Sequence, residues 1–74
     1  MKEYNYLVFY NLGEKDTAKI FKRQTTLTIH DLNGNMIADE VFKEIVSRVQ
    51  EMEECEEYRT YVEITNVCLL NLHQ

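Results

Sequence analysis

The chain has 74 residues and a formal net charge of −5, from 13 acidic and 8 basic side chains. This length suits one domain with one small core, and 45% hydrophobic residues exclude a disordered segment. The acidic balance disfavours direct binding to nucleic acid, and no apolar run is long enough for a membrane-spanning helix. We therefore expect a single domain over residues 1–74, with no membrane as a partner.

The first predicted strand covers residues 4–12, which are rich in aromatic and β-branched side chains. Leu7 and Phe9 point to one face of this strand. The opposite face carries a larger apolar set, Tyr4, Tyr6, Val8, Tyr10 and Leu12. Apolar residues on both faces predict a central strand of a sheet.

A turn at residues 13–16 leads into a second predicted strand at residues 17–30. Its later part alternates, with Leu27 and Ile29 on one face and polar residues on the other. Its earlier part is charged, which is typical of an exposed sheet edge. The short turn predicts an antiparallel hairpin between the two strands.

Residues 37–54 have the apolar period of an amphipathic helix. The predicted apolar stripe contains Ile37, Val41, Ile45, Val49 and Met52, and Phe42 and Val46 widen it. Asn35 is the predicted N-cap, and Asp39 and Glu40 suit the positive end of the helix dipole.

The loop before this helix has part of the spacing of a calcium loop, at Asp31, Asn33, Asn35 and Asp39. Met36 stands where the sharp turn of such a loop needs glycine, and Phe42 stands where a bidentate glutamate should close the shell. The pattern therefore predicts a turn at Asn33–Gly34 followed by a helix, and no metal site.

A third predicted strand covers residues 60–72. A right-handed crossover through the helix places this strand beside the first one, which gives the sheet order 2-1-3. The expected fold class is α+β: a three-stranded antiparallel sheet with one amphipathic helix packed on one face, in the order ββαβ.

One helix covers one face of such a sheet, so an apolar face stays open whichever side of the first strand meets the helix. With Leu7 and Phe9 under the helix, the open face carries Tyr4, Tyr6, Val8 and Tyr10; with the reverse parity it carries Leu7 and Phe9. The open face predicts a small protein-interaction module that self-associates, as a homo-oligomer, or binds a larger protein. We take the four residues of the tyrosine face as the candidate site.

An acidic run at residues 51–57 offers a second candidate surface, through Glu51, Glu54 and Glu57. Negative charge at a helix C-terminus is unfavourable against the dipole, so the run is either a solvated end or a patch for a basic partner. The alternative function is related to nucleic acid, by acidic mimicry of phosphates or by a tyrosine platform that stacks bases.

Catalytic patterns are missing from the sequence, which has no phosphate loop, dinucleotide fingerprint or paired histidine motif. We therefore expect no enzyme and no cofactor. Cys55 and Cys68 have no zinc spacing, and the first residues lack the apolar stretch of a signal peptide. Two reduced thiols in a cytoplasmic protein are the expectation.

The layout as a whole resembles that of small proteins encoded by phages and prophages. The likeness lies in the tyrosine-rich opening at residues 4–10, the threonine- and isoleucine-containing strand at 25–29 and the closing strand at 66–72. The resemblance implies a small cytoplasmic accessory protein, in some cases an inhibitor of a host enzyme. It implies no particular functional residue.

Overall fold

The architecture is a three-stranded antiparallel sheet with one helix on one face, seen in a computed structural model that describes residues 2–32, 34–55 and 59–73. The elements are β1 (Lys2–Glu14), β2 (Ile20–Asp31), α1 (Ala38–Met52) and β3 (Thr60–His73). The sheet order is β2-β1-β3. The predicted ββαβ fold and the central position of the first strand are confirmed.

The β1–β2 hairpin turns two residues later than the sequence predicts. Glu14 donates its N–H to the Lys19 carbonyl at 2.9 Å, and Ala18 closes the loop in a left-handed conformation with φ 58°. Gly13 stays in the strand, where a Cβ would lie 2.1 Å from Cζ of Tyr61. Glycine at this position therefore makes room for an aromatic ring instead of making the turn.

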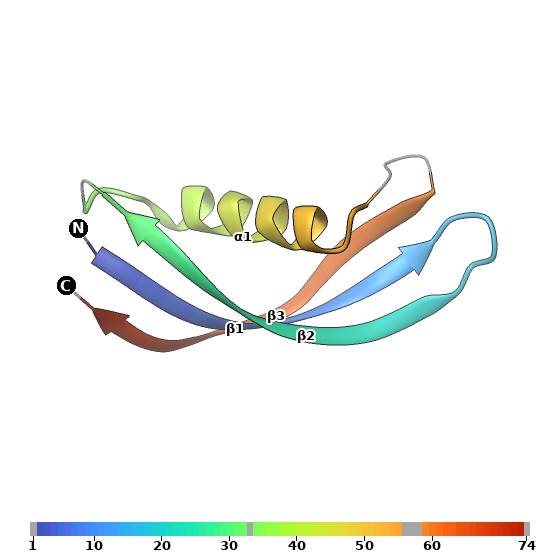
Figure 1. The fold of residues 1–74 in the computed structure, drawn as a ribbon, viewed down its shortest axis with the longest axis horizontal. Coiled ribbons are helices and arrows are strands. Elements are labelled where there is room, and N and C mark those ends of the chain that lie inside the picture. Colours follow the sequence, from blue (N-terminus) through green and yellow to red (C-terminus); the bar gives the residue numbers. More distant parts are fainter. Residues whose placement is uncertain (1, 33, 56–58, 74) are drawn as a thin grey trace.

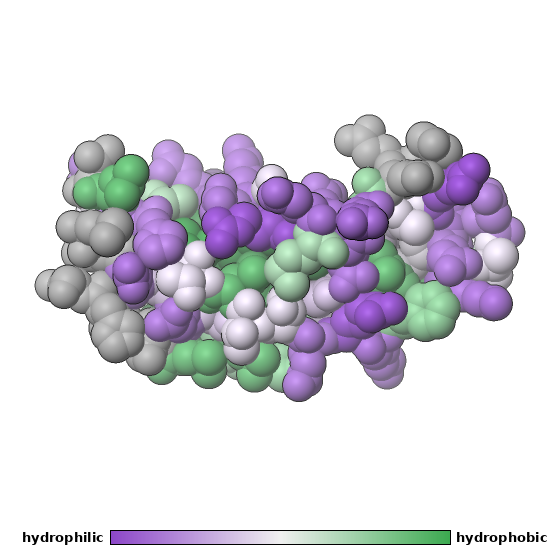
Figure 2. All heavy atoms as spheres, in the orientation of Figure 1, coloured by the Kyte–Doolittle hydropathy of each residue, from purple (hydrophilic) through white to green (hydrophobic). Residues whose placement is uncertain are grey.

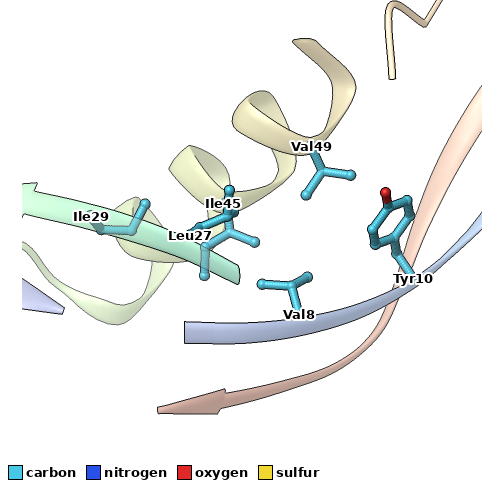
Figure 3. Packing of buried hydrophobic residues seen from close by; sticks show 6 residues of the cluster. All are labelled: Val8, Tyr10, Leu27, Ile29, Ile45 and Val49. Carbon is cyan, nitrogen blue, oxygen red and sulfur yellow. The ribbon is translucent and has the colours of Figure 1, made fainter. Parts of the chain in front are cut away.

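The sheet curls along its length so that its ends rise on the side of α1, as Figure 1 shows. The helix lies in the middle of this concave face, and the core forms beneath it. Figure 3 shows Ile45 and Val49 of α1 pointing down onto Val8, with Leu27 and Ile29 of β2 beside them. These five side chains and Tyr10 are the buried hydrophobic residues of the described chain.

The start of α1 differs from the prediction. The N-cap is Ile37, which makes no side-chain capping bond, and Asn35 is not the cap. The loop is instead organised by Asp31, whose two carboxylate oxygens accept the N–H groups of Asn35 and Met36 at 3.1 and 3.0 Å. Asp31 is 2% exposed, and these two bonds compensate the loss of water around its carboxylate.

The buried stripe of α1 is shorter than the predicted stripe. Ile45 and Val49 are fully covered, whereas Ile37 and Met52 at the two ends are 60% and 52% exposed. The buried residues therefore lie in the central and later turns of this 15-residue helix. Asp39 and Glu40 do lie in the first turn, as predicted from the helix dipole.

Candidate interaction surface

The tyrosine face of β1 lies under the helix, so its residues do not form an open platform. Val8 is 0% and Tyr10 3% exposed, and both belong to the core. Tyr4 and Tyr6 lie on the same covered side, half-buried, with their rings stacked at 6.3 Å between centroids. The choice of these four residues as an exposed interaction face was therefore wrong for Val8 and Tyr10.

Strand register explains this parity. The apolar residues of β2 alternate on a single face, and β1 pairs Tyr4 with Ile29 and Tyr6 with Leu27. Directly opposed residues of an antiparallel pair share a face, so the tyrosines must join these residues in the core. Leu27 and Ile29 mark the core face of β2 in the sequence. They identify the core face of β1 only when the register is known, and the register requires the turn to be placed at residues 15–18.

Tyr10 also anchors the end of the helix. Its hydroxyl donates to Oε1 of Glu53 at 2.5 Å, and the other carboxylate oxygen of Glu53 lies 3.7 Å from Nε of Arg23 on β2. Burial under α1, together with the Glu53 hydrogen bond, raises the pKa of Tyr10 to about 12. One glutamate of the acidic run thus joins α1 to two strands.

The rest of the acidic run ends the helix. Glu54 has a positive φ of 52° and donates its N–H to the Glu51 carbonyl at 3.2 Å, while Cys55 donates to the Gln50 carbonyl at 3.0 Å. These two bonds form a Schellman motif, in which glycine is the usual residue at the position of Glu54. Glu51 and Glu54 are exposed, and Glu57 lies outside the described residues.

An apolar groove opens where the start of α1 separates from the sheet. We call it the α1–β3 groove; its volume is about 330 Å³, and its lining consists of Tyr4, Tyr6, Met36, Ala38, Val41, Phe42, Ile45 and Val67. No residue of β2 lines it, which places it on the β3 side of the helix. Phe42 at its rim is 50% exposed. Burial beside this groove raises the pKa of Tyr6 above its usual value.

The outer side of β3 borders this groove. Because β1 is its only sheet neighbour among the described strands, β3 presents one free edge. The stretch from Ile64 to Leu72 contains no charged residue, and Leu69 and Leu70 are 55% and 54% exposed. We call the outer side of residues 64–70 the β3 edge. Long uncharged edges are the sites at which another strand pairs most readily.

The open face of the sheet is less apolar than the sequence suggests. Leu7 and Phe9 lie there half-buried, and each has one paired neighbour on β2 and one on β3. Leu7 pairs with Thr26 and Cys68, and Phe9 pairs with Gln24 and Asn66, so polar groups break the apolar surface into a narrow strip. Figure 2 shows apolar atoms along the strand side of the molecule and polar atoms over the outer face of α1.

Metal and membrane sites receive no support from the described residues. They contain no cluster of three or more His, Cys, Asp or Glu side chains that would hold a metal. In the calcium-like spacing, both carboxylate oxygens of Asp31 accept hydrogen bonds from backbone N–H groups. Cys55 and Cys68 are free thiols. Across the same residues, no helix has the length and hydropathy to cross a bilayer.

Comparison with protein families, with curated proteins and with solved structures finds no match to this chain. The resemblance to small phage-encoded proteins therefore stays a prediction. The α1–β3 groove and the β3 edge lie together on the β3 side of the molecule.

Proposed function

We propose that this chain is a non-catalytic protein-interaction domain that works in the cytoplasm. The observation that carries the proposal is the union of the α1–β3 groove with the uncharged β3 edge. A strand that pairs with the edge gains backbone hydrogen bonds, and its alternate side chains reach an apolar groove on one face. This is the geometry of partners that bind by adding a strand to a sheet.

The free thiols of Cys55 and Cys68 support a reducing compartment. The tyrosine platform of the nucleic-acid alternative loses support, because Val8 and Tyr10 are buried under α1. Glu51 and Glu54 are exposed, so phosphate mimicry by the acidic run stays a prediction. A protein partner is the function that the surface supports best.

Site-specific photo-crosslinking tests the proposal. A benzophenone amino acid replaces Phe42 at the groove rim or Leu69 on the β3 edge, in living cells that produce the chain. The matched control places the same amino acid at Lys43 or Ser47, which are exposed on α1. We expect protein adducts from the first pair of positions and none from the control pair, because only the first pair lies at the groove rim or on the β3 edge.

A second substitution makes the result specific. An adduct formed at Phe42 should disappear when Leu69→Asp places a charge on the β3 edge, because both positions belong to one surface. Adducts that form equally from Ser47, or that survive Leu69→Asp, would show nonspecific capture and would contradict the proposal.

A further inference from the structure

We infer that the strand added to the β3 edge is β3 of a second copy of this chain, antiparallel to the first and with Cys68 at the two-fold axis. The product is a continuous six-stranded sheet in the order 2-1-3-3-1-2, with both helices on one face. This inference rests on the proposed function and names its partner. Hydrogen-bond direction, register, charge and area at the β3 edge all bear on this pairing.

Hydrogen-bond direction comes first. Val67 donates its N–H to Oδ1 of the neighbouring Asn66 at 2.9 Å, so this N–H is not used by β1. In an antiparallel ladder a residue directs its N–H and C=O to the same side, and the residue two positions on does likewise. The backbone N–H and C=O groups of Val67 and Leu69 therefore point toward an incoming strand. The Asn66 side chain must first release the Val67 N–H.

The register follows from the faces of the sheet. A two-fold axis normal to the sheet keeps each face continuous, so it must pass through a pair formed by one residue and its own copy. With Cys68 on the axis, Val67 of one copy lies opposite Leu69 of the other, and the two exchange both backbone bonds. Val67 and Leu69 share the helix side, since β1 pairs them with Val8 and Tyr6. Apolar side chains then meet beside both grooves.

Charge on the edge does not oppose the pairing, because the stretch from Ile64 to Leu72 contains no charged residue. Each copy has a net charge of −5, so the overall repulsion between copies falls as salt is added. The dimer should therefore resist salt.

Area sets the remaining requirement. The nine residues from Ile64 to Leu72 include two irregular positions of β3 and span at most about 30 Å, so a sheet about 10 Å thick gives a footprint of at most about 600 Å² for the two edges together. A specific interface buries at least about 1,000 Å². The paired backbone alone falls short, and the exposed side chains of Leu69, Leu70 and Phe42 are the apolar surface that supplies the difference.

Sedimentation of the purified chain tests the inference, with the reduced protein diluted from about 100 μM to about 1 μM. We expect twice the mass of the 8.9 kDa chain at the upper concentration, unchanged or increased by ~0.5 M salt. Leu69→Lys should weaken the dimer at least about tenfold, because it places a charge on the edge. Leu32→Lys, the same change at a leucine that is 72% exposed elsewhere, should leave it intact.

Two further variants test the details. A short bismaleimide should join two copies through Cys68, because a non-hydrogen-bonded pair brings Cα atoms to about 4.5 Å. Cys68→Ser should abolish this adduct and keep the dimer, whereas Cys55→Ser should keep both. Asn66→Thr should tighten the dimer severalfold, since it removes the amide that competes for the Val67 N–H.

The outcomes are separable. A single-chain mass at about 100 μM overturns the inference; adducts to a different protein from Phe42 and Leu69 would leave the proposed function standing. A dimer that ignores Leu69→Lys, or that Cys68 does not crosslink, overturns the assigned edge or register. Loss of both self-association and all position-specific adducts overturns the proposed function as well.

Discussion

The two edges of the sheet differ in charge and in covering by other side chains. The β2 edge carries Lys22 and Arg23 after its first two residues, Ile20 and Phe21, and Arg48 of α1 reaches over it to the Thr28 carbonyl at 3.4 Å. The β3 edge has no charge between Ile64 and Leu72, and a single amide side chain, that of Asn66, occupies the Val67 N–H. Proteins protect edges with charge and with covering elements. Here the helix protects one edge and leaves the other accessible.

The same asymmetry appears in the core. Leu27 and Ile29 of β2 are buried under α1, while the apolar residues Val62, Ile64 and Val67 of β3 are only partly covered. The side chains of β2 are therefore better covered by α1 than those of β3, and the α1–β3 groove is open space beside β3. A surface for a partner and a protected edge are two results of one helix position.

The largest expected effect compares one residue type on the two edge strands. Ile29→Ala removes a side chain that is 1% exposed and should lower the free energy of unfolding by about 2–5 kcal/mol. Ile64→Ala, at a half-covered position, should cost about 1 kcal/mol. Denaturant unfolding of both variants at low concentration gives the difference. Equal losses would show that α1 covers both strands alike.

The anchor between α1 and the β2 side should be visible at alkaline pH. The pKa of Tyr10 is 10.0 when unfolded and about 12 when folded, so its protonated hydroxyl stabilises the fold fully below pH 10. Stability should fall by about 2–3 kcal/mol as the pH rises from 10 through 12.

Two variants isolate this anchor. Tyr10→Phe should flatten that part of the pH profile, because no hydroxyl is left to ionise, and Glu53→Gln should reduce its slope. Denaturant midpoints measured at steps of pH give the profile. A Tyr10→Phe protein whose stability falls as steeply as that of the unchanged chain would contradict the assignment.

The link from α1 to β3 begins with a strained residue. Glu54 adopts φ 52°, which costs a non-glycine residue about 1 kcal/mol or more. Glu54→Gly should therefore raise the free energy of unfolding by about 1 kcal/mol. Glu54→Ala, which removes the charge and keeps the strain, is the control for electrostatics at the helix end. Thermal unfolding of both variants decides between strain relief and charge removal.

The smallest effect concerns the protected edge itself. Arg48→Met keeps most of the aliphatic stem and removes the hydrogen bond to the Thr28 carbonyl, at an expected cost of about 0.5 kcal/mol. Lys43→Met on the exposed face of α1 should change stability less. If Arg48 protects the β2 edge, its loss should also raise light scattering of concentrated protein, whereas Lys43→Met should not.

Much of the fold was predictable because its signals are local. The alternation in β2, the period of α1 and the two apolar faces of β1 led to the order ββαβ and to a central first strand. The parity of β1 was not predictable in the same way, because both sets of apolar residues were compatible with a core. Only the register with Leu27 and Ile29, set by the position of the hairpin turn, decides it.

The surface was harder to predict for a related reason. The α1–β3 groove depends on how α1 is seated on the sheet, and tertiary contacts such as those of Arg48 and Glu53 fix that position. The sequence marked Glu53 only as one member of an acidic run. Long-range partners of this kind have no signature in local spacing.

The pairing of β1 with β3 has a consequence for the order of folding. Near the hairpin turn β1 pairs with residues close in the chain, such as Gly13 with Ile20, but its pairing with β3 joins Glu3 to His73. Contacts between residues so far apart in the sequence form late, because the loop that they close is long. During synthesis, the residues of the β1–β2 hairpin and of α1 leave the ribosome before those of β3. Until then the central strand is itself an uncovered edge, and the nascent chain is at its most vulnerable to aggregation.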